Sequence, residues 1–171
     1  MGSIINTALR GLALLWTLLI TALIGNVIAS NVNARTSAQS AVNFAMFVAA
    51  LSWVALIYGL AASFFSSLAL PMIMLPLDGL ATLFTFIAAI VLAAKLGVPD
   101  CGDIDRDDHS RSWIAFGSRN DEKRCREIQA STVFMWFLWV CFVGCLFFTV
   151  KNARGGYGGS IRSSRPAMSQ V

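Results

Sequence analysis

Asp78 is the only Asp, Glu, Lys or Arg between Arg35 and Lys95, and it lies about two helical turns into an apolar run. A carboxylate at that depth in a bilayer costs several kcal/mol unless it is protonated or paired. With no basic residue expected inside the apolar runs, the carboxyl must find hydroxyl donors or take a proton. We expect Tyr58 to be its first partner and Thr17 its second. These three are the candidate intramembrane polar residues for lipid recognition or proton relay, and the alternative is a hydrogen-bonded carboxyl that only fixes helix register.

The four cysteines divide into two pairs with different expected chemistry. Cys101 and Cys125 stand near the two ends of a polar segment, where a disulfide would close a loop of about 25 residues and contribute on the order of 3 kcal/mol. Two unpaired thiols are the alternative. Cys141 and Cys145 form a CxxxC pattern in an apolar run, not the CxxC of a redox catalyst, and are expected to be small packing residues.

Metal and cofactor chemistry is not expected. His109 is the single histidine, and it stands among acidic residues in the polar segment. That setting favours a solvated loop over a metal site. The sequence therefore predicts no cofactor and no metal.

Four apolar stretches must position these residues: 11–30, 42–65, 70–94 and 128–150. Each is long enough to cross a hydrocarbon layer of roughly 30 Å as a helix. The chain is 57% hydrophobic and 13% charged, so the spans leave no room for a soluble catalytic domain. The sequence predicts an all-α integral membrane bundle of four helices that is not an enzyme and has no nucleic-acid partner.

Every span carries a stripe of small residues at intervals of four. Such stripes let helix backbones approach closely, which is what drives helix association in lipid. We expect them to pack the bundle internally; the alternative is that they mediate a homo-oligomer. The stripes are Ala13, Thr17, Thr21 and Gly25; Ala55, Gly59 and Ser63; Ala81, Thr85, Ala89 and Ala93; and Cys141, Cys145 and Thr149.

Two polar segments complete the predicted architecture. Residues 1–150 form the membrane domain, in which 95–127 is a capping loop closed by the disulfide. Residues 151–171 are expected to be a disordered basic tail, in which cations attract an anionic leaflet by about 1 kcal/mol each. Phosphorylation would weaken that attraction, although such cations often serve only to set orientation. The cations are Lys151, Arg154, Arg162 and Arg165, and the phosphorylation candidates are Ser163 and Ser164.

The orientation in the membrane follows from two conflicting indications. Lys and Arg counts alone favour a cytosolic loop. However, the basic residues of the loop are interleaved with acids, and a disulfide in it requires an oxidising compartment. We therefore expect both termini in the cytosol and the 95–127 loop outside.

Several segments together resemble one family. They are NFAMF near Asn43, YGLAASF from Tyr58, LALPMIMLPLDGLATLFTFIAAIVLA around Asp78, CREIQA from Cys125, and the terminal SQV. In this order they resemble the fungal non-classical export proteins, MARVEL-domain tetraspans associated with eisosomes. The sequence departs from the family mainly in the acidic half of the loop and in the Gly-rich tail.

The resemblance implies a multi-pass plasma-membrane protein that organises furrow-like lipid microdomains and responds to sphingolipid status. Its implied partners are lipids of a sphingolipid- and sterol-rich domain, the anionic inner leaflet and eisosome scaffold proteins. One alternative is a small four-span transporter or channel that uses Asp78, although a single intramembrane acid is thin support. Another alternative is a four-span thiol oxidoreductase, which the lack of CxxC disfavours.

Overall fold

The computed structural model describes residues 2–32, 36–65, 71–97, 100–102 and 113–160. These residues form four helices: α1 (Gly2–Ala29), α2 (Thr36–Phe64), α3 (Pro71–Leu96) and α4 (Asp121–Ser160). All four are long and apolar enough to cross a membrane. The predicted all-α bundle with four spans is therefore confirmed.

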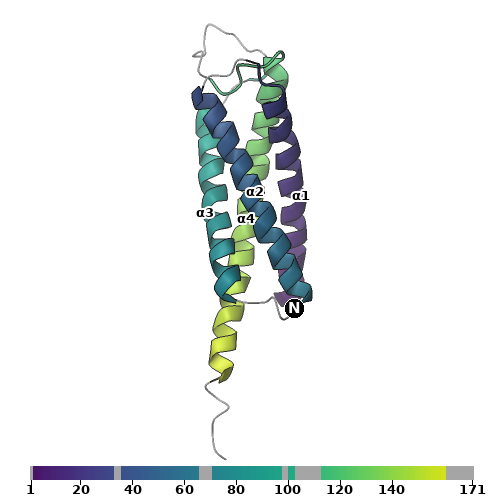
Figure 1. The fold of residues 1–171 in the computed structure, drawn as a ribbon, viewed down its shortest axis with the longest axis vertical. Coiled ribbons are helices and arrows are strands. Elements are labelled where there is room, and N and C mark those ends of the chain that lie inside the picture. Colours follow the sequence, from purple (N-terminus) through teal and green to yellow (C-terminus); the bar gives the residue numbers. More distant parts are fainter. Residues whose placement is uncertain (1, 33–35, 66–70, 98–99, 103–112, 161–171) are drawn as a thin grey trace, which may run out of the picture.

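The helices pack in a closed ring, as Figure 1 shows. Helix α1 contacts α2 and α4, and α3 contacts the same two helices. The N-terminus lies at the end of the bundle where α4 runs on past the other three helices. Helices α2 and α3 are neighbours that run in opposite directions and form a hairpin.

The ends of α3 and α4 follow from local chemistry. Gly97 ends α3 with a φ of 74°, the left-handed conformation that closes many helices. Asn120 caps α4, since its side-chain oxygen accepts a hydrogen bond of 3.0 Å from the Lys123 backbone N–H. Asp121 and Glu122 then place negative charge in the first turn, where the helix dipole favours it.

Three helices are longer than the apolar runs indicated, and α2 begins at Thr36, six residues before its run 42–65. Helix α1 begins at Gly2 and not near residue 11, and α4 extends beyond residues 128–150 at both ends. Extending an existing helix requires no new nucleation, so polar residues at its ends can join it. The predicted disordered tail is thus wrong for Lys151 to Ser160. Residues 161–171, with Arg162, Ser163, Ser164 and Arg165, lie outside the described residues.

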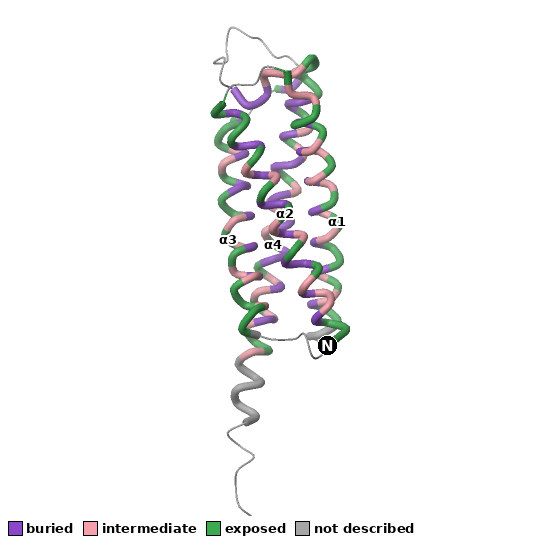
Figure 2. The backbone as a smooth tube through the Cα atoms, in the orientation of Figure 1, coloured by how far each residue is buried: buried purple, intermediate pink, exposed green. Residues whose placement is uncertain are grey.

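The inner faces of the helices carry small residues together with larger apolar side chains such as Leu56 and Phe142. Other large apolar side chains, such as Leu18, Phe47 and Ile57, point outward. Figure 2 shows buried positions facing the axis of the bundle and exposed positions facing away from it. Most stripe residues are buried, so the stripes pack the bundle internally as expected. Their hydroxyls mostly bond within their own helix, as Ser63 does to the Gly59 carbonyl at 2.9 Å.

Cys101 and Cys125 form a disulfide with their Cα atoms 5.7 Å apart, as the sequence predicted. Cys125 lies in α4 itself, so the cross-link ties the polar connection directly to the start of that helix. Cys141 and Cys145 are free and buried, in agreement with packing residues. His109 lies outside the described residues.

We predict that replacing Cys101 and Cys125 together by serine lowers the free energy of unfolding by up to about 3 kcal/mol, because the cross-link restricts the unfolded chain. Thermal unfolding of the purified protein in detergent measures the effect. A reductant should lower the midpoint of the wild type and leave the variant unchanged. Equal midpoints for the oxidised wild type and the variant would contradict the prediction.

Candidate functional site

Asp78 on α3 is fully buried and is bound by an arginine. The Arg10 guanidinium on α1 donates two hydrogen bonds to the carboxylate, from Nη2 to Oδ2 at 2.6 Å and from Nη1 to Oδ1 at 3.2 Å. Both side chains are out of contact with solvent. A two-point contact of this kind fixes the relative orientation of both groups as well as their distance.

The expectation that no basic residue could reach Asp78 is therefore wrong. Arg10 seemed to precede the first span, but α1 starts at Gly2 and carries Arg10 well inside the helix. The small-residue stripe could have revealed this. Continued backward from Thr17 and Ala13 at helical spacing, the same face of α1 presents Arg10 and then Asn6, and both are buried.

Thr149 on α4 also binds the carboxylate, with its hydroxyl donating to Oδ2 at 2.8 Å. Sequence analysis placed Thr149 on a packing stripe but not beside Asp78. The expected partner Thr17 instead donates to the Ala13 carbonyl of its own helix at 2.8 Å. Tyr58 is half-buried on α2, and its pairing with Asp78 stays a prediction.

Helix α2 meets this cluster through its backbone. Arg10 Nη1 lies 3.5 Å from the Ala55 carbonyl oxygen. Gly59 lies one turn further, and a Cβ atom at that position would overlap the guanidinium. The missing side chain of Gly59 is therefore what admits Arg10, and the cluster joins all four helices at one level of the bundle.

Electrostatics explain why the two charges of the cluster are paired with each other and why the carboxylate is hydrogen-bonded further. Removing a lone charge from water is expensive, and a pair repays that cost only when its geometry and remaining hydrogen bonds are good. Here the two charges cancel and Thr149 provides a further donor to the carboxylate. Among the described residues, Arg10 Nε and Asn6 Oδ1 are buried without a hydrogen-bond partner. Because Arg10, Asp78, Thr149 and Gly59 come one from each helix, we name them the four-helix polar cluster.

A second buried arginine, Arg124, lies at the opposite end of the bundle, and the sequence analysis did not single it out. Arg124 Nε donates to the Ile114 carbonyl at 3.0 Å, and Nη1 donates to the Val27 carbonyl at 3.4 Å. Nearby, Trp113 Nε1 donates to the Leu96 carbonyl at 2.9 Å. These bonds attach the described part of the α3–α4 connection to the ends of α3 and α4, and they join the start of α4 to the end of α1.

Comparison with known proteins identifies the type of bundle. The model of the MARVEL family, described as a membrane-associating domain, matches residues 3–148. Non-classical export protein 2 of Saccharomyces cerevisiae (strain ATCC 204508 / S288c) is 30% identical over 148 residues, which cover 85% of this chain and 83% of that protein. Non-classical export protein 2 homolog 1 of the same organism is 33% identical over 159 residues, covering 85% and 87%. No solved structure matches.

We predict that Asp78→Asn destabilises the bundle strongly, because the amide leaves the Arg10 guanidinium buried without a counter-charge. Breaking a buried pair by removing one partner costs about 3–5 kcal/mol. If Asp78 had no basic partner, Asp78→Asn would be expected to leave most of the stability of the bundle unchanged. The matched control is Glu122→Gln, which makes the same change in an exposed pair and should cost about 1 kcal/mol or less. Equal thermal midpoints for the two variants would refute this assignment.

We also predict that Gly59→Ala disrupts the cluster, since the new methyl group and the guanidinium cannot occupy the same space. The control is Gly25→Ala, where an added Cβ meets nothing within 4 Å. There the change should be neutral or stabilise the helix by about 1 kcal/mol. Unfolding in detergent measures both variants, and a wild-type midpoint for Gly59→Ala would show that Arg10 does not depend on this gap.

Proposed function

Because this chain belongs to the MARVEL family of membrane-associating domains, we propose that it is a non-enzymatic organiser of lipid microdomains in the plasma membrane. It acts in furrow-like, eisosome-type domains, responds to sphingolipid, and is connected with non-classical export, the process in the names of its two relatives. Both termini face the cytosol, and the α3–α4 connection faces outward.

The proposal rests on where polar, apolar and aromatic side chains lie in the bundle. The interior is filled by small and large apolar residues and by the four-helix polar cluster, and the outside presents further large apolar and aromatic side chains. Rings from three helices line this outside: Trp16 stacks on Phe134 with centroids 5.4 Å apart, and Phe86 lies 5.2 Å from Trp139. A bundle of this kind offers its binding surface to lipid.

Lipid affinity must differ between states for such a protein to respond. A lipid shifts an equilibrium only by as much as it prefers one state over another. We propose that assembly in the membrane is the equilibrium concerned, between dispersed and clustered protein, and that sphingolipid- and sterol-rich surroundings favour the clustered form. The cations Lys151, Arg154, Arg162 and Arg165 then hold the C-terminal segment near the anionic leaflet until Ser163 or Ser164 is phosphorylated and a scaffold protein binds.

A transporter or channel that uses Asp78 is the alternative. It would need Asp78 to face an aqueous path, but both carboxylate oxygens are bound by Arg10 and one also by Thr149. Flux of ions or small solutes into liposomes that contain the protein discriminates between the two functions.

We predict that labelled protein in giant vesicles of sphingolipid, sterol and phospholipid forms clusters, and that enzymatic removal of the sphingolipid headgroup disperses them. Fluorescence microscopy measures the clustered fraction, and a solute-leakage dye in the same vesicles reports any transport. The control is protein whose bundle is disrupted by Gly59→Ala. An even distribution that ignores sphingolipid, or a solute flux specific to the folded protein, would contradict the proposal.

A further inference from the structure

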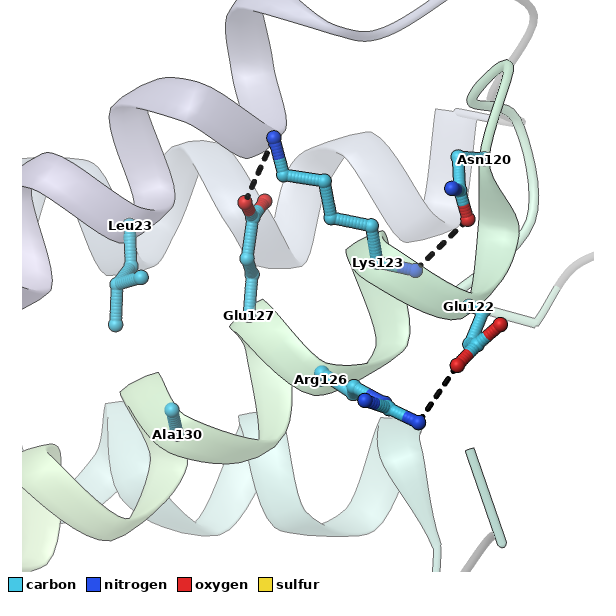
Figure 3. Close-up of a pocket in the computed structure, with 7 residues that line it drawn as sticks. All are labelled: Leu23, Asn120, Glu122, Lys123, Arg126, Glu127 and Ala130. Atoms are coloured by element: carbon cyan, nitrogen blue, oxygen red, sulfur yellow. Dashed lines mark hydrogen bonds and ion pairs between the residues drawn. The ribbon is translucent and has the colours of Figure 1, made fainter. Parts of the chain in front are cut away.

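A pocket of about 340 Å³ lies on the outside of the bundle, in the crevice between α1 and the beginning of α4. Figure 3 shows that its walls differ in character. Leu23 of α1 and Ala130 of α4 form an apolar side, and charged residues of the first turns of α4 gather on the other side. The polar lining consists of Asn120, Glu122, Lys123, Arg126 and Glu127.

The pocket lies at the boundary between polar and apolar chain. Glu127 directly precedes Ile128, where the apolar run of α4 begins, and Leu23 belongs to the apolar part of α1. In a bilayer this level is the interface, where lipid headgroups meet their acyl chains. A lipid beside this crevice would have its headgroup against the charged side and its chain against the apolar side.

The charged side is fixed to the bundle at one point. Glu127 accepts a 2.5 Å hydrogen bond from Asn26 of α1 and also lies 3.7 Å from the Lys123 ammonium. Its side chain is only 11% exposed, whereas that of Lys123 is 64% exposed. Glu127 therefore holds Lys123 over the pocket while leaving the ammonium accessible.

The second ion pair leaves donor groups available in the same way. Arg126 contacts Glu122 at 2.6 Å, and both side chains are more than half exposed. A guanidinium has five N–H donors and an ammonium has three, so single ion pairs leave most of them open to another acceptor. Two cations and two carboxylates make the charged side neutral overall, with both signs at its surface.

We propose that this pocket binds the headgroup of a zwitterionic phospholipid. The phosphate accepts hydrogen bonds from Lys123 and Arg126, the ammonium lies against Glu122, and the acyl chain follows Leu23 and Ala130. A fully anionic headgroup gains less, because Glu122 and Glu127 repel it. The site goes beyond the proposed function, since it can exist whether or not the protein organises microdomains.

Native mass spectrometry of the purified, disulfide-bonded full chain tests the site. The probes are phosphatidylcholine, phosphatidylglycerol and diacylglycerol with identical acyl chains, together with soluble glycerophosphocholine. The wild type should retain phosphatidylcholine about tenfold more than either other lipid, a difference of about 1.4 kcal/mol. Glycerophosphocholine should compete weakly, because it lacks the chain that contacts Leu23 and Ala130.

Variants distinguish a built site from general attraction. K123Q/R126Q should reduce retained phosphatidylcholine about tenfold, whereas the control R119Q/K151Q changes two exposed cations outside the pocket and should retain it. E122Q should lower phosphatidylcholine retention and raise phosphatidylglycerol retention, with an unchanged thermal midpoint as evidence of folding. Equal retention of all three lipids, equal loss in both double variants, or full competition by glycerophosphocholine would overturn the proposal. These results do not depend on clustering in vesicles.

Discussion

The contact between Arg10 and Asp78 is the constraint on which the rest of the bundle depends. Neither charge is tolerated alone at this depth, so the two helices that carry them must bring them together. The carboxylate then takes the Thr149 hydroxyl, and the guanidinium lies against the backbone of α2 at Ala55 and Gly59. One ion pair thus sets the register of four helices.

Small residues make that contact accessible. The guanidinium reaches Asp78 because Gly59 leaves a gap, and α1 and α4 are so close at Gly144 that a Cβ there would lie 2.9 Å from Leu9. Apart from Thr149, the hydroxyls of the stripe residues bond within their own helices, as Thr85 does to the Ala81 carbonyl at 2.7 Å. The inner faces are consequently closed to lipid, and the outer faces and the interfacial pocket are the surfaces that remain for lipid contact.

Hydropathy and spacing predicted the four helices, the buried stripes and the Cys101–Cys125 disulfide, because each depends on local composition or on a simple pattern. The partners of Asp78 could not be predicted in this way. Their identity depends on where α1 begins and on how far the long Arg10 side chain reaches across the bundle. Arg124 was missed for a similar reason. One of its partners, the Val27 carbonyl, is distant in sequence, and the other, the Ile114 carbonyl, lies in the polar connection.

A double-mutant cycle on the ion pair tests this account most directly. Free energies of unfolding in detergent would be measured for the wild type, Arg10→Met, Asp78→Leu and the combined variant. If the pair sets the register, each single change leaves a buried charge and costs about 3–5 kcal/mol, while the double variant removes both charges and recovers most of that loss. Costs that simply add in the double variant would contradict the central role of the pair.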